Sequence, residues 1–559
     1  MTHESNEDLK TMQDEISTEK GKTQDNVNRF NYLLPPTSRP MVMDRRHNKV
    51  YPNENKTDVT VDSTGKQVTF SISGGGGMCV DPHTVCITGN LKVNATNAGD
   101  RYYNAAGVFG SLARLEVVSF TGESLCDIQS PDVLATILLR GSCPNMYFET
   151  VGSEFLMPVR NPVDKRAVTV QTLGIGAAGD QATYNALPNL LNTSENVIPT
   201  LKIPNINLNN NNNGAVLQPA AAATETTIYR NMAAVLNLLE SYHYPYNYED
   251  TKTKRWFNLA GSAFCLPIWL IIPLFRQDKY IPVESFKKLD IRLTFNQPDQ
   301  FLTEYVNAGA REAITYTFTN LSLEYQTIRI NDAMMFALRK KMMGDGLNFY
   351  TRNYWRTSSL IGAGISSATI NISRSVGDAT ALFFVVRTTA YAAGGIGFQA
   401  NTVANRLQAD KLYFEALGTL PVDAAVFLNA AVSSRPQTFR WYVQIGQDRI
   451  PSQYIDTVPK ELCSVQQAFG KYGDISNQVY SQYDFATGLA VRGLNLEIDP
   501  VSQSGMSFTG YSLQNGVQMQ LYIEAMDQTD PKQFDIFLEY TETITMTQNK
   551  DNVHIVVRQ

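Results

Sequence analysis

The sequence predicts an all-β protein built from two antiparallel β-sandwiches in tandem. The chain has 559 residues, which is more than one ordinary hydrophobic core accommodates. Short segments in which apolar and polar residues alternate recur between turn signals, and they fill two comparable halves. Tyrosine and phenylalanine, which favour strands, number 27 and 26. These observations favour sandwiches over helical bundles.

The first half contains strands that each predict one buried face. Val68, Phe70 and Ile72 alternate with polar residues, and a longer alternation runs through residues 289–295. A third alternation begins at Ile314 and changes parity near Asn320. Since a change of parity moves side chains to the other face, we expect a β-bulge at this position.

The second half repeats this pattern without an exact sequence repeat. Residues 381–386 (ALFFVV) predict a strand that is buried on both faces, and alternation returns in residues 517–523 and 536–546. Three short helices are predicted from capping residues and apolar spacing, at residues 130–141, 332–343 and 459–469.

Composition divides the chain into three parts. Residues 1–60 begin with a polar, acidic stretch and predict a flexible N-terminal arm. We expect the first sandwich in residues 61–330 and the second in residues 331–559. Within the first, residues 160–260 include an asparagine run and predict a long surface insertion, with helical spacing at residues 229–242.

The charge balance argues against sequence-independent nucleic-acid binding, and no sequence-specific binding is expected. The formal net charge is −6, whereas binding of the phosphate backbone needs clustered lysine and arginine. The basic stretch of Arg45, Arg46, His47 and Lys49 is interpreted as a solvated turn.

The cysteines and the apolar segments predict a protein of a reducing compartment with no transmembrane segment. The N-terminus lacks the features of a secretory signal. The most apolar run, residues 264–275, contains two prolines and is too short for a membrane span, so we expect a buried strand or pair of strands. No CxxC pair is present, and six free, mostly buried thiols are expected: Cys79, Cys86, Cys126, Cys143, Cys265 and Cys463.

No catalytic, cofactor-binding or metal-binding residue is predicted. The five histidines have no ligand spacing, so a zinc site is not expected. The glycines at 74–77 lack the Lys-Ser or Lys-Thr of a phosphate-binding loop, and no GxSxG motif occurs. The sequence therefore favours a structural protein over an enzyme.

Four segments together resemble the double jelly-roll major capsid proteins of DNA viruses, the lineage of polinton-like viruses, virophages and, more distantly, adenoviruses. Residues 107–139 resemble the family's strand–turn–strand–helix block, and residues 266–296 the end of its first jelly roll, with Tyr280, Ile281 and Pro282. Residues 441–456, with Gly446, Pro451 and Gln453, are similar to a hairpin of the second jelly roll, and residues 494–557, with a Ser504-Gly505 turn, to its closing strands. Residues 160–260 depart from the family pattern.

The resemblance implies two tandem eight-stranded antiparallel β jelly rolls with short helices and long surface insertions. It also implies a homotrimer whose six jelly rolls form a pseudo-hexagonal capsomer. Such capsomers tile an icosahedral shell around a double-stranded DNA genome, in contact with neighbouring capsomers and with penton and minor capsid proteins. The expected location is the virion, with assembly inside the host cell. The helix at 332–343 is expected to connect the two jelly rolls stiffly.

Two other classes of function stay open from the residues alone. A carbohydrate- or receptor-binding sandwich would need exposed aromatic side chains, and Tyr242, Tyr244, Tyr246 and Tyr248 are the candidates. A glycoside hydrolase on a jelly roll would need paired carboxylates, which the 53 acidic residues could supply.

Overall fold

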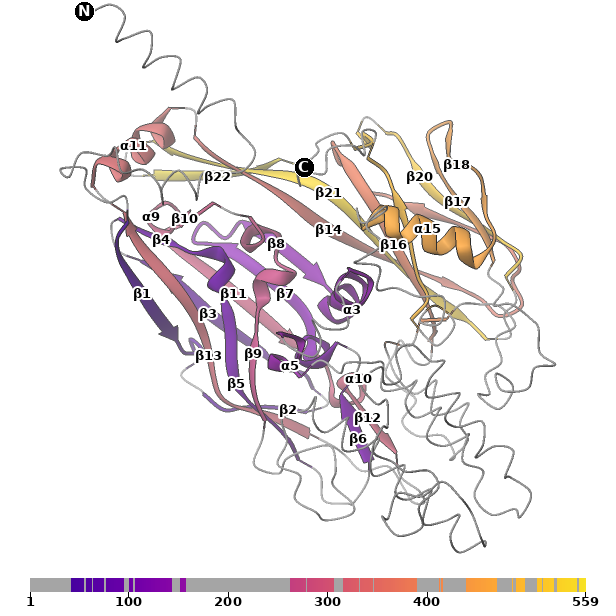
Figure 1. The fold of residues 1–559 in the computed structure, drawn as a ribbon, viewed down its shortest axis with the longest axis horizontal. Coiled ribbons are helices and arrows are strands. Elements are labelled where there is room, and N and C mark those ends of the chain that lie inside the picture. The colour runs from indigo at the N-terminus through magenta and orange to yellow at the C-terminus, as the bar shows by residue number, and fades with distance from the viewer. Residues whose placement is uncertain are drawn as a thin grey trace, which may run out of the picture.

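The computed structural model describes most of two β-sandwiches that lie side by side (Figure 1). With shorter gaps, the described residues are 42–156, 262–389 and 439–558, together with 412, 414 and 415. The predicted insertion at 160–260 and its helix at 229–242 lie outside them, as do residues 1–41 of the predicted arm.

The first sandwich is organised around the long strand β13 (Thr315–Ile330). Two shorter strands line each edge of β13, and two more complete the sheet. These strands are β1 (Val42–Val50), β2 (Val59–Val61), β4 (Met78–Val80), β5 (Cys86–Asn94), β9 (Ser262–Leu266) and β10 (Ile281–Pro282). Tyr316, Phe318, Leu321 and Leu323 of β13 are buried in the core.

The parity change in β13 is the predicted β-bulge. The pairing of β13 with β5 shifts register between Thr319 and Ser322. Between them, Asn320 has a φ of 53°, a left-handed conformation that asparagine tolerates better than most residues. The bulge lets buried side chains continue on the same face of the sheet although their parity changes.

A four-stranded sheet packs over this large sheet. Its strand order is β3-β11-β7-β8, from β3 (Gln67–Ser73), β11 (Lys288–Phe295), β7 (Leu112–Ser119) and β8 (Ser124–Gln129). A separate pair joins β6 (Asp100–Tyr103) to β12 (Leu302–Tyr305). The alternating segments predicted at 68–72 and 289–295 pair directly with each other, with Phe70 opposite Ile291.

The helices of the first half are short. The predicted helix at 130–141 is confirmed as α3 (Pro131–Ser142). The others are α5 (Val151–Glu154), α9 (Val283–Phe286), α10 (Pro298–Phe301) and the 3₁₀ turns Pro82–Thr84, Gly107–Ser111, Ile268–Leu270 and Pro273–Phe275.

The second sandwich also has two sheets. One has the order β14-β21-β16-β19, from β14 (Leu347–Ile361), β21 (Lys532–Asn549), β16 (Ala379–Thr388) and β19 (Val491–Asn495), with β22 (Asn552–Arg558) added to β21. The other has the order β15-β20-β17-β18, from β15 (Ala368–Ile372), β20 (Met519–Glu524), β17 (Arg440–Ile445) and β18 (Asp448–Ile455). The predicted helix at 459–469 is α15 (Val458–Ala468), one residue earlier at each end.

Both sandwiches follow one strand order. In the first half the principal strands in chain order are β2, β3, β5, β7, β8, β9, β11 and β13, and in the second they are β14 to β21. Numbered in this way, each half has one sheet ordered 1-8-3-6 and one ordered 2-7-4-5. Eight antiparallel strands in two such sheets form a jelly roll, so the predicted pair of tandem eight-stranded jelly rolls is confirmed.

Three expectations differ in detail. Residues 264–275 are mostly buried, as expected, but only their start belongs to strand β9, and two 3₁₀ turns follow. Pro267 and Pro273 explain the change, because proline donates no hydrogen bond to a sheet. Residues 42–50, which we placed in the arm, form strand β1 along the edge of β13. The basic stretch 45–49 is therefore an exposed strand and not a turn.

The helix predicted at 332–343 is confirmed as α11 (Asp332–Met343). Its buried side packs through Met335 and Leu338 onto Ile328 and Ile330 of β13. In Figure 1 it lies at one end of the first jelly roll, away from the second. The helix carries the chain from β13 to β14, whereas long strands make the contact between the two jelly rolls.

Candidate functional site: the junction between the two jelly rolls

Strand β16 of the second jelly roll is buried on both faces. Alternate residues of β16 point to opposite sides, and Leu382, Phe384 and Val386 join the core between the two sheets of the second jelly roll. Ala381, Phe383 and Val385 belong instead to the core that contains the first jelly roll. The continuous apolar run predicted at 381–386 arises because both faces of this strand are covered.

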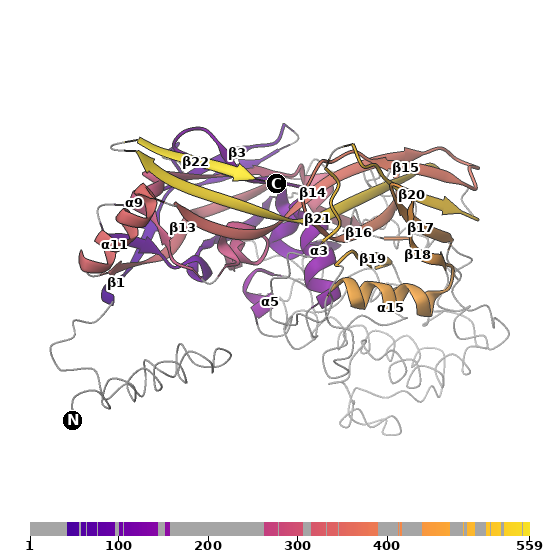
Figure 2. The ribbon, with the colours of Figure 1, turned by 90° about the horizontal axis from the view of Figure 1, so that it is seen from above.

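Long strands of the second jelly roll make its contact with the first jelly roll. Strands β14, β21 and β22 form an antiparallel ribbon that reaches across it (Figures 1 and 2). Phe349 of β14 lies against Phe286 of α9, with ring centroids 6.4 Å apart. Met546 of β21 and Ile555 of β22 are buried in the same core. The relative position of the two jelly rolls is therefore set by apolar packing.

A second contact joins helices from the two halves. The ring of Phe469, which follows α15, stacks on Phe383 with centroids 4.8 Å apart. Gly141 of α3 lies against the same ring, and a β-carbon at Gly141 would be 2.3 Å from its Cε2 and Cζ atoms. Only a residue without a side chain fits at this position.

Replacing Gly141 with alanine should destabilise the protein by about 1–3 kcal/mol through overpacking. In an unhindered helix the same change would stabilise the protein by about 1 kcal/mol. The sign of the change in folding stability therefore tests the contact between Gly141 and Phe469. Urea denaturation measures the difference. The double variant G141A/F469L, which removes the crowding ring, should recover part of the loss. A G141A protein as stable as the wild type would contradict the proposed contact.

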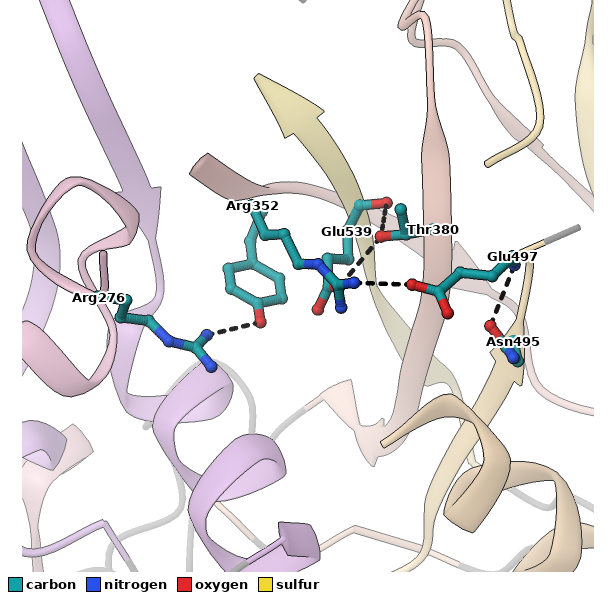
Figure 3. A network of polar contacts seen from close by, with 7 residues as sticks. Arg276, Arg352, Thr380, Asn495, Glu497 and Glu539 are labelled. Atoms are coloured by element: carbon teal, nitrogen blue, oxygen red, sulfur yellow. Dashed lines mark hydrogen bonds and ion pairs between the residues drawn. The ribbon is translucent and has the colours of Figure 1, made fainter. Parts of the chain in front are cut away.

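Polar side chains cross the junction in a chain of contacts (Figure 3). Arg276 of the first jelly roll donates from Nη1 to the hydroxyl of Tyr354 on β14, at 3.0 Å. Burial raises the pKa of Tyr354, so its hydroxyl stays protonated at neutral pH. This hydrogen bond ties the turn at 273–275 to the central part of β14.

Arg352 continues the chain within the second jelly roll. Its guanidinium contacts Glu497 at 2.8 Å and Glu539 at 3.2 Å, while Thr380 donates to Glu539 at 3.0 Å (Figure 3). Burial raises the pKa of Glu497, and the nearby Glu539 carboxylate acts in the same direction, against the opposing effect of Arg352. One guanidinium thus partly neutralises two carboxylates.

Two further charge clusters are buried within the second jelly roll. Glu461 of α15 accepts hydrogen bonds from Trp441 Nε1 at 2.8 Å and from Arg492 Nε at 3.2 Å. Asp535 of β21 accepts from Arg387 Nε at 2.8 Å and also contacts Arg356. In each cluster, arginine side chains compensate the charge of the buried carboxylate. We therefore interpret both clusters as part of the fold.

The described residues contain no cluster of metal ligands and no helix suited to span a membrane. Within them, no group of three or more histidine, cysteine or acidic side chains could hold a metal ion. None of the helices in the described part of the chain has the length and hydropathy of a transmembrane helix. Tyr242 to Tyr248, the candidate sugar-binding residues, lie outside the described residues.

An aromatic and cationic cluster on the outer face of the second jelly roll escaped the sequence analysis. Tyr442 and Tyr522 stack on adjacent strands with centroids 4.8 Å apart. The Arg449 guanidinium lies 3.9 Å from the ring of Tyr442 and 4.2 Å from that of Tyr454. The sequence signal that could have predicted the cluster is the presence of tyrosines at the polar positions of β17 and β20. Tyrosine and arginine are enriched at protein interfaces, so this cluster is a candidate contact surface.

Comparisons with solved structures identify the same fold in viral proteins. The Faustovirus major capsid protein matches with a TM-score of 0.51 and 10% identity, over 94% of both chains. A chain of the Sputnik virophage structure matches at 0.46 and 10%, covering 96% of this chain and 92% of that one. The mavirus major capsid protein matches at 0.40 and 8%, over 94% of both chains. No family model and no curated protein matches the sequence. The chain has the double jelly-roll fold.

Proposed function

We propose that this protein is the major capsid protein of a DNA virus. The observation that carries the proposal is the pair of jelly rolls with one strand order, which apolar packing of β14, β21 and β22 joins into a single body. Further support comes from the Faustovirus major capsid protein, whose fold is shared over nearly the whole chain. The role is structural and needs no catalytic residue.

The mechanism is the tiling of a shell by trimers. Two rigidly joined jelly rolls per chain, formed by residues 61–330 and 331–559, give six in a trimer and an approximately hexagonal outline. Such trimers pack into flat facets of an icosahedral capsid around double-stranded DNA. Neighbouring capsomers, penton proteins and minor capsid proteins are the expected partners, and the N-terminal arm predicted from the sequence is proposed to contact them. The virion is the proposed location, after assembly inside the host cell.

Charge supports a shell that encloses the genome without neutralising it. The net charge of the whole chain is −6. The basic side chains of β1 are matched by acidic neighbours: Arg46 by Asp44 at 2.6 Å, and Lys49 by Glu324 at 3.3 Å. Binding to the DNA backbone would need cations with no such partners.

The native mass of the purified protein tests the proposal. A trimer has three times the chain mass of 62.2 kDa, or about 187 kDa. We expect light scattering to give this value and negative-stain images of the same peak to show hexagonal outlines. A monodisperse monomer at every concentration tried would overturn the tiling mechanism.

A further inference from the structure

Two cysteines of the first jelly roll lie next to each other on neighbouring strands. Cys265 of β9 pairs opposite Thr88 of β5, and Cys86 lies two residues before Thr88. Because alternate residues of a strand share a face, Cys86 and Cys265 project from the same face as diagonal neighbours. Their thiol groups hydrogen-bond to each other.

The position of this pair in the sheet suits a covalent link. Cys86 is the first residue of β5 and Cys265 the last but one of β9, so both lie near strand ends, where the backbone can adjust. A disulfide needs β-carbons about 3.8 Å apart, and diagonal neighbours must move closer to reach that spacing. Both side chains are half-buried, so small molecules can reach them.

The hydrogen bond makes the two thiols unequal. The bond from Cys86 lowers the pKa of Cys265, although burial and the carboxylates of Glu154 and Glu324 oppose this effect. The same bond, together with burial, raises the pKa of Cys86. Since the thiolate is the nucleophile in disulfide exchange, Cys265 is the thiol that reacts first.

We propose that Cys86 and Cys265 form a disulfide when the protein meets an oxidising small-molecule disulfide. The Cys265 thiolate attacks one sulfur of oxidised glutathione, which gives a mixed disulfide and releases one glutathione thiolate. Cys86 then loses its proton to solvent and attacks Sγ of Cys265. The protein disulfide forms and a second glutathione leaves, so two electrons pass from the cysteine pair to the oxidant.

The link would constrain an unusually long stretch of chain. The two cysteines are 179 positions apart (265 minus 86), and the predicted insertion at 160–260 lies between them. Cross-links that close long loops restrict the unfolded chain most. The bond would form inside one jelly roll, so the inference stands whether or not the protein forms a shell.

The test treats the full-length folded protein with oxidised glutathione and then measures intact mass and peptide masses. We expect the loss of two hydrogens and one cross-linked peptide joining Cys86 to Cys265. The midpoint of thermal unfolding should rise by about 5 °C and return after reduction. The variant C463S, which removes a half-buried thiol of the other jelly roll, should still form the link.

Single-cysteine variants distinguish the thiol that attacks glutathione from the thiol that closes the disulfide. C86S should stop at the mixed disulfide and retain one glutathione on Cys265. C265S should leave Cys86 slower to react than Cys265 is in C86S. A wild-type protein that keeps glutathione on Cys265 without forming the cross-linked peptide would overturn the inference, and so would a folded protein in which neither thiol reacts.

Discussion

The variant E461A is expected to lose about 3–5 kcal/mol of folding free energy, because it removes one partner of a buried ion pair. Glu461 and Arg492 are both fully buried, and Glu461 also accepts the hydrogen bond from Trp441. Without the carboxylate, the Arg492 guanidinium would lose its buried counter-charge, although it stacks on aromatic rings such as Phe439 at 4.2 Å and donates to a backbone carbonyl at 3.3 Å.

Denaturant unfolding measures this loss, and two control variants interpret it. E461Q retains an acceptor for Trp441 but removes the charge, so its stability should lie between those of E461A and the wild type. D456A breaks the exposed pair of Asp456 with Lys460 and should cost less than about 1 kcal/mol. If E461A and D456A were equally stable, the buried pair would not hold α15 to the sheet.

The variant D535A should cost about the same, about 3–5 kcal/mol, because Arg387 is buried with it. Burial alone would raise the pKa of Asp535, but the guanidinium groups of Arg387 and Arg356 outweigh burial and lower it. A carboxyl group with a lowered pKa in the folded state contributes stability above its unfolded pKa of about 3.9. That contribution is lost as the pH falls through the folded pKa.

The loss of stability at low pH therefore tests the contact between Asp535 and Arg387. The wild type should lose stability steeply below about pH 4, whereas D535N, which has no carboxyl group to protonate, should show a shallower decline. The exposed variant D456N serves as a control and should keep the wild-type slope. Equal slopes for D535N and the wild type would mean that Asp535 does not drive the acid transition.

The sequence predicted where the strands and helices lie better than it predicted which elements pack against one another. The parity change at Asn320 and the apolar run 381–386 each predicted a real feature, because periodicity directly reports which faces are buried. The break at Pro267 was missed since an apolar run without clear periodicity does not distinguish a strand from buried 3₁₀ turns. Strand β1 was missed because its exposed basic side chains do not alternate with apolar ones.

The buried charges could not be found from sequence alone. Arg387 follows the apolar run 381–386 inside β16, and Arg492 lies inside the short strand β19. In sequence, each residue would look the same if it faced solvent. Their partners are far away in the chain: Asp535 is 148 residues from Arg387, and Glu461 is 31 from Arg492. Only the folded arrangement brings these groups together, so the buried charge clusters of the second jelly roll could not be predicted.

The sheet that serves two cores also has a mechanical consequence. Any hinge motion that opened a gap between the jelly rolls would expose Phe349 of β14 and Met546 of β21 to water. Since β21 also carries Ile536 and Leu538 in the core of the second jelly roll, the same distortion of the strand would strain the packing there. Bending is therefore opposed by two hydrophobic layers at once. In the proposed capsomer, each subunit would therefore resist flexing, and curvature would be left to the contacts between subunits.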